Sequence, residues 1–139
     1  MALPFLCARH KQHVLCQPEQ ALIDIETAQI SGEALFKQAQ FAQALPHLGS
    51  ALESVTLLTQ MHNYADKTQL IQITSLTERL YATLYFLGEK HAAHNALAQS
   101  ISLLYDLFYC DDKLSDFVFA CIAQLKKLAL QHPQHLTEH

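Results

Sequence analysis

Cysteine and histidine side chains recur every third residue near the start of the chain, as Cys7, His10, His13 and Cys16. Thiolate sulfur and imidazole nitrogen are the ligands of structural zinc sites, and a cysteine followed three residues later by a histidine matches half of many such sites. If the segment is one helix, Cys7 and Cys16 face opposite sides, because they are nine residues apart. Binding of one zinc ion therefore requires either that the segment forms a loop or that ligands from elsewhere in the chain join Cys7 and His10.

Two other interpretations of this segment stay open. The first is an N-terminal arm over residues 1–17 that packs on the following helices while its histidines face solvent. Its packing residues would be Leu3, Phe5, Leu6 and Leu15. The second is a disulfide between Cys7 and Cys16, which a reducing cytoplasm disfavours. Zinc is the only cofactor that the sequence suggests.

Sequence patterns that mark catalysis are missing. Three isolated glycines do not form a phosphate-binding loop, and neither a His-Glu-x-x-His pattern nor a Gly-x-Ser-x-Gly elbow occurs. Asp111, Asp112 and Asp116 lie together, but acids at the start of a helix usually compensate its dipole. We therefore expect that the protein is not an enzyme.

Charge and hydropathy exclude several classes of partner. Nine Lys and Arg stand against thirteen Asp and Glu, a net charge of −4, and Lys126-Lys127 is the only adjacent basic pair. Nucleic-acid binding needs a clustered basic face and is not expected. No apolar run approaches the roughly 18 residues that span a bilayer, and the N-terminus lacks a secretory signal pattern. We expect a cytoplasmic protein with no membrane partner.

The chain as a whole has the pattern of an all-α protein. Half of its residues are apolar, and only three are glycine and four proline. Apolar residues recur at three- and four-residue steps in five segments, which predicts five helices. They span about residues 19–39, 41–61, 65–87, 90–109 and 114–131. We expect a single helical domain over residues 18–131, followed by a polar tail over 132–139.

Small and large residues alternate through residues 32–53. The small residues are Gly32, Ala39, Ala44 and Ala51, and the large ones are Leu35, Phe36, Phe41 and Leu48. This stretch resembles a tetratricopeptide repeat, in which a small residue lets two helices approach and a glycine, here Ala39, makes the turn. A weaker echo follows in Leu84, Tyr85, Gly88, Ala93 and Leu97.

The resemblance implies antiparallel helical hairpins in a tetratricopeptide-like array, with the fifth helix as a cap. Aligning Ala44 with Ala93 sets the two units 49 residues apart, whereas the family period is 34 residues. We therefore do not expect the regular superhelix of that family. An ordinary antiparallel bundle, which shows similar alternation, is the alternative.

In this family the first helix of each hairpin lines a concave groove that binds a partner. The matching positions here are Glu26, Gln29, Glu33, Phe36, Lys37, Ser75, Glu78, Ala82, Tyr85 and Phe86. Aromatic side chains among polar ones suit a peptide or a helix as the ligand. Phe36, Tyr85 and Phe86 can equally fill the core. Paired Lys and Arg that clamp a terminal carboxylate are missing, which disfavours an acidic C-terminal ligand.

Three functions follow as hypotheses. The first is a protein-interaction module, an adaptor or scaffold that binds a protein segment or associates with itself. The low charged fraction of 16% favours self-association. The second is a zinc-binding structural or sensory protein that uses the Cys/His cluster. The third is a purely structural bundle, for example a homodimer.

Overall fold

A computed structural model describes residues 5–62, 66–110 and 112–131, and these residues contain helices and no strand. The helices are α1 (Ala8–Cys16), α2 (Pro18–Lys37), α3 (Phe41–His62), α4 (Lys67–Phe86), α5 (Lys90–Cys110) and α6 (Ser115–Gln131), with a short 3-10 helix at Asp112–Leu114. The all-α prediction is confirmed, and the five predicted helices match α2 to α6. The predicted tail over 132–139, Leu3 and Asp111 lie outside the described residues.

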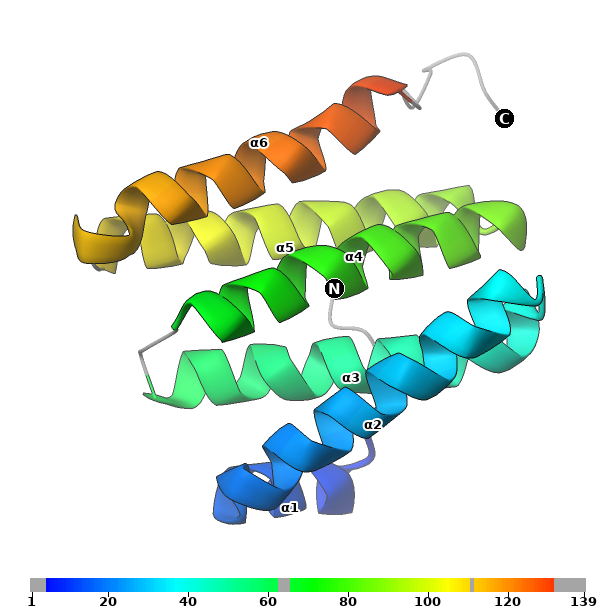
Figure 1. Ribbon diagram of the computed structural model, residues 1–139, viewed down its shortest axis with the longest axis horizontal. Coiled ribbons are helices and arrows are strands. Elements are labelled where there is room, and N and C mark those ends of the chain that lie inside the picture. Colours follow the sequence, from blue (N-terminus) through cyan, green and yellow to red (C-terminus); the bar gives the residue numbers. More distant parts are fainter. Residues whose placement is uncertain (1–4, 63–65, 111, 132–139) are drawn as a thin grey trace.

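The helices pack on one another in chain order. Figure 1 shows α3 beside α2 and α4, and α5 beside α4 and α6; α4 also contacts α2 and α6 directly. The central position of α4 explains its composition, because nine of its residues are buried. Within the described residues, no helix is long and apolar enough to cross a membrane.

A buried glycine sets the distance between α2 and α3. A β-carbon on Gly32 would lie 2.7 Å from the side chain of Leu48, so the helices approach too closely there for any larger residue. On α3, Ala44 and Ala51 are 0% and 1% exposed. Three of the small residues singled out in the sequence, Gly32, Ala44 and Ala51, are therefore buried.

The turns after α2 and after α4 have the same backbone geometry. Ala39 has a φ of 60° and Gly88 a φ of 81°. In each turn this residue donates its N–H to the carbonyl three residues back, and the next N–H donates to the carbonyl five residues back, at 2.8–3.0 Å. This pair of hydrogen bonds is the Schellman motif, which ends a helix with one left-handed residue. The two turns are 49 residues apart in the sequence.

The segment that begins at Phe5 is held on α3 by one carboxylate. The N–H groups of Phe5 and Leu6 donate to Glu53 Oε1 at 2.9 and 3.1 Å. Lys11 Nζ lies 3.6 Å from the other oxygen of this carboxylate. The Phe5 ring covers Gly49, where a β-carbon would come within 2.5 Å of the ring. The segment with α1 therefore packs on α2 and α3, to which it adds a helix beyond the five expected.

Candidate partner-binding groove

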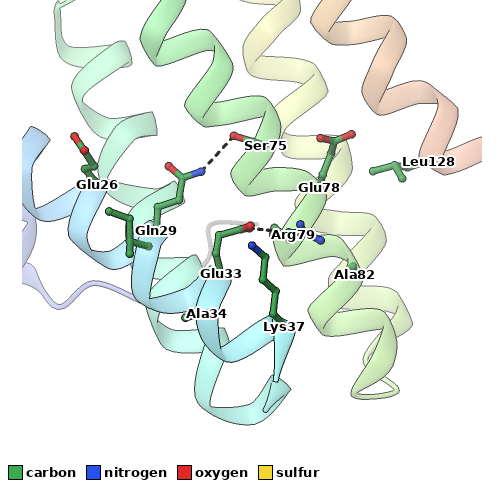
Figure 2. A pocket seen from close by; sticks show the side chains of 11 residues that line it. Glu26, Gln29, Glu33, Ala34, Lys37, Ser75, Glu78, Arg79, Ala82 and Leu128 are labelled. Atoms are coloured by element: carbon green, nitrogen blue, oxygen red, sulfur yellow. Dashed lines mark hydrogen bonds and ion pairs between the residues drawn. The ribbon is translucent and has the colours of Figure 1, made fainter. Parts of the chain in front are cut away.

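An open cavity of about 880 Å³ lies between α2 and α4 and reaches α6. Figure 2 shows its two walls facing each other, with the side chains of α2 on one side and those of α4 on the other. Its lining consists of Glu26, Gln29, Ile30, Glu33, Ala34 and Lys37 from α2, Ser75, Glu78, Arg79 and Ala82 from α4, and Leu128 from α6. We call this cavity the α2/α4 groove.

Seven of the ten residues that the family resemblance assigned to a groove lie together in this lining. They are Glu26, Gln29, Glu33, Lys37, Ser75, Glu78 and Ala82. The other three, Phe36, Tyr85 and Phe86, do not line it. The structure therefore brings together Ala82 and the polar members of the predicted set, and leaves out the aromatic ones.

Two polar contacts cross the groove and fix the register of its walls. Gln29 Nε2 donates to Ser75 Oγ at 3.3 Å, and Arg79 Nε donates to Glu33 Oε1 at 2.7 Å (Figure 2). In both contacts the partners are 46 residues apart. Each step of four residues on α2 is thus matched by four on α4, so the two helices run in the same direction.

The same register continues from α4 to α6. Gln124 Nε2 donates to Glu78 Oε2 at 3.0 Å, and these two residues are again 46 apart. Leu128, which lines the groove from α6, is likewise 46 residues after Ala82 on α4. The helices α2, α4 and α6 therefore lie side by side and contribute to one surface, with α4 in the middle.

The charges of the groove are only partly compensated. Arg79 is engaged twice, by the carboxylate of Glu33 and by the ring of Phe36, whose centroid lies 4.5 Å from the guanidinium carbon. Within the described residues, no Lys, Arg or His nitrogen lies within 4.0 Å of the carboxylates of Glu26 and Glu78. Lys37, in the last turn of α2, is placed where a cation compensates the helix dipole.

Apolar side chains run along the groove between these charges. Ile30 is 63% exposed although it is large and aliphatic. Ala34 is exposed, and Ala82 and Leu128 are half-buried. A molecule that occupied the groove would therefore contact apolar side chains bordered by charged groups.

The three aromatic residues outside the lining pack with other aromatic residues, and Phe36 also contacts Arg79 of the lining. Phe36, Phe41 and Phe86 contact one another, with Phe41 and Phe86 stacked at 4.9 Å between ring centroids. Phe86 is nevertheless 64% exposed. Tyr85 stacks on Tyr81 with 5.9 Å between their centroids. Phe36, Tyr85 and Phe86 therefore lie at the C-terminal ends of α2 and α4.

Sequence reasoning missed Ile30, Ala34, Arg79 and Leu128. Ile30 and Ala34 lie one position beyond Gln29 and Glu33, so the wall from α2 is wider than the family pattern suggested. An aliphatic residue such as Ile30, off the buried stripe of its helix, was a signal that the sequence contained. Arg79 and Leu128 depend on the packing of α4 against its neighbours, which no local pattern reveals.

The Cys/His cluster is spread around α1. Cys7 precedes the helix and Cys16 ends it, and both are exposed free thiols. His10 is exposed, and His13 Nε2 lies 3.9 Å from Asp24 Oδ2 on α2. In the part of the chain that the structure describes, no three His, Cys, Asp or Glu side chains come close enough to hold one metal ion. Zinc binding by this cluster stays a prediction.

Comparisons of the chain with protein-family models, with curated proteins and with solved structures find no match. The resemblance to tetratricopeptide repeats therefore rests on the residues of this chain alone. The geometry of the α2/α4 groove is what points to a function.

Proposed function

We propose that this chain is an adaptor or scaffold module of tetratricopeptide-like type, whose α2/α4 groove binds a peptide or helix of a protein partner or of a second copy. One observation carries the proposal: seven residues assigned to a binding groove from the sequence line a single open cavity. These residues come from two helices that are far apart in the sequence. Their convergence is what a binding surface requires.

The proposed architecture is a pair of antiparallel hairpins, α2–α3 and α4–α5, capped by α6. Two features support it. The turns at Ala39 and Gly88 share one hydrogen-bond pattern, and Gly32 allows close contact within the first hairpin. In this arrangement the first helices of the hairpins, α2 and α4, share one face and form the walls of the groove.

The chemistry of the groove favours binding over catalysis. Within the described residues, its lining includes no His or Cys. The hydroxyl of Ser75 donates to the carbonyl of Ile71 at 2.7 Å and accepts from Gln29, so no base is placed to activate it. The carboxylate of Glu33 is held by Arg79. Nucleophile and base within hydrogen-bond reach are the usual sign of covalent catalysis, and this lining has no such pair.

Site-specific photocrosslinking in the native cells tests the proposal. A photoreactive amino acid at Ala34, exposed in the groove, should give one or a few discrete adducts. The same amino acid at Ala98, exposed on α5 outside the groove, is the matched control. An adduct of twice the chain mass of 15.7 kDa would identify self-association. Equal crosslinking from both positions, or none from Ala34, would refute the groove as the binding site.

A further inference from the structure

We propose that the occupant of the α2/α4 groove is a basic amphipathic helix, with an apolar face and two Lys or Arg residues about six positions apart. This inference rests on the proposed function and specifies the class of partner. It follows from three properties of the groove. The backbone groups of its walls are already used in helical hydrogen bonds. Among the described residues, its charges without an ion pair are mainly acidic, Glu26 and Glu78 against Lys37, and the 46-residue register sets the positions of the two carboxylates along the groove.

The groove offers the backbone of an extended peptide no free backbone groups and few free side-chain groups. The backbone groups in the middle of α2 and α4 are used in helical hydrogen bonds. The amide of Gln29 and the hydroxyl of Ser75 bind each other, and Arg79 binds Glu33. An extended segment would bury unpaired N–H and C=O groups there, whereas a helix satisfies its own. Helix-in-groove binding is therefore the favoured mode.

The charges that remain available to an occupant are mainly acidic. Because Arg79 is already held by Glu33 and by the Phe36 ring, it offers little to an acidic ligand. The carboxylates of Glu26 and Glu78 lie beside the exposed apolar strip that includes Ile30. An occupant with complementary charge therefore has lysine or arginine next to Glu26 and next to Glu78.

The register gives the spacing of these two places. Since partners across the groove are 46 residues apart, Glu78 lies at the level of Gly32 on the opposite wall. Glu26 is six residues before Gly32 on α2, which corresponds to about 9 Å along the helix axis. In an occupant helix that lies along the groove, residues six apart are also about 9 Å apart in height. They lie about 120° apart around its axis, so they flank an apolar face of the usual width.

Selection from a displayed library tests this prediction directly. The library consists of 18-residue helical peptides with a constant leucine stripe and with Lys, Gln or Glu at random in the flanking positions. Selection on the wild-type protein should enrich lysine over glutamate about five- to tenfold at flanking positions six apart, the size expected of two exposed ion pairs. Raising the salt concentration should weaken binding of the selected peptide.

Variants of the protein assign the preference to the groove. Glu26→Gln combined with Glu78→Gln should weaken the selected lysine peptide about five- to tenfold, while the amide oxygen at position 78 still accepts from Gln124. Glu19→Gln, the same change at an exposed carboxylate of α2 outside the lining, should leave its affinity unchanged. Ile30→Asn, which removes the apolar contact without adding a charge, should weaken the binding of peptides of every charge.

The outcomes separate this inference from the function on which it rests. Lysine enrichment that disappears in the double variant and persists in Glu19→Gln supports the inference. If the selected peptides show no charge preference, or a preference for glutamate, and yet fail to bind the Ile30→Asn variant, this result overturns the basic partner and leaves groove binding intact. Selected peptides that bind Ile30→Asn as tightly as the wild-type protein also overturn the inference. No enrichment, together with no crosslinked adduct from Ala34, refutes both proposals.

Discussion

Ala39 holds a backbone conformation that normally selects glycine. Its φ of 60° lies in the left-handed region, which costs a residue with a β-carbon about 1–2 kcal/mol. Gly88 makes the equivalent turn after α4 without that cost. Both residues are exposed, so packing of the side chain does not offset the strain. The sequence had placed Ala39 at the position of a turn glycine, and its dihedral angle gives the physical reason for that preference.

Exchanging the two turn residues should change stability in opposite directions. Ala39→Gly should raise the free energy of unfolding by about 0.5–1 kcal/mol, because relief of strain exceeds the extra entropy that glycine loses on folding. Gly88→Ala should lower it by about 1 kcal/mol. Urea unfolding of the two variants measures both values. Destabilisation by Ala39→Gly would show that this turn is not left-handed.

Tyr81 should make the protein sensitive to alkaline pH. Burial raises the pKa of its hydroxyl, and the nearby Tyr85 raises it further. In the unfolded chain the group ionises near its ordinary value of about 10. Its contribution to stability is therefore present below pH 10 and is lost as the pH rises through the folded pKa. Tyr81→Phe should flatten the decline of stability above pH 10, as measured by urea unfolding. Tyr109→Phe, at a residue 82% exposed, should leave the decline unchanged.

Two buried glycines of the helices control two different contacts. Gly32 sets the approach of α2 to α3, where Leu48 is fully buried, and Gly49 receives the ring of Phe5 from the N-terminal segment. The first contact lies inside the main helical array, whereas the second only joins α1 and the residues before it to that array. The same substitution should therefore have different consequences at the two positions.

Gly32→Ala should destabilise the whole domain, and Gly49→Ala should release mainly the N-terminal segment. At Gly32 the added methyl group overpacks Leu48, which costs about 1–3 kcal/mol and exceeds the gain in helix propensity of about 1 kcal/mol. At Gly49 it displaces Phe5, so trypsin should cleave faster after Arg9 and Lys11. Thermal unfolding and limited proteolysis measure the two effects. A larger loss of melting temperature from Gly49→Ala than from Gly32→Ala would contradict this assignment.

The helices of the array were predictable from sequence because each carries its own apolar period. Pro18 opens α2 and Gly88 follows α4, which added local signals for the ends. By contrast, α1 was not predicted as a helix. Only Val14 of its nine residues is buried, and the segment before it is docked by Glu53, 47 residues or more along the chain. No local pattern contains that contact.

The groove was predictable where it depends on a helix face and unpredictable where it depends on register. Positions such as Gln29 and Ser75 followed from a family pattern, and both line the cavity. The contact of Arg79 with Glu33 depends on how far α4 is shifted along α2. Leu128 depends in turn on how α6 lies on α4. Such shifts are decided by packing across three helices, so the sequence of one helix does not specify them.

For the molecule as a whole, zinc content tests the conformation of the N-terminal segment. The helical conformation of α1, in which Cys7 and Cys16 face opposite sides, predicts less than about one-tenth of an equivalent of zinc in protein purified without an affinity tag, whereas the zinc-binding hypothesis predicts about one. Elemental analysis measures this ratio. About one equivalent, lost in Cys7→Ser, would show that the segment leaves the helical conformation to form a metal site.

The register of the three helices also has a consequence for the shape of the molecule. Facing residues on α2 and α4 are 46 apart, whereas the two equivalent turns are 49 apart. If α2–α3 and α4–α5 are equivalent units, as proposed, the second is displaced by three residues, or about 4.5 Å, along the first. In an array extended by further copies of this unit, each copy would be shifted by the same distance, in the same direction, along the helix axis. A ligand that crosses the helices would meet equivalent side chains along a diagonal line.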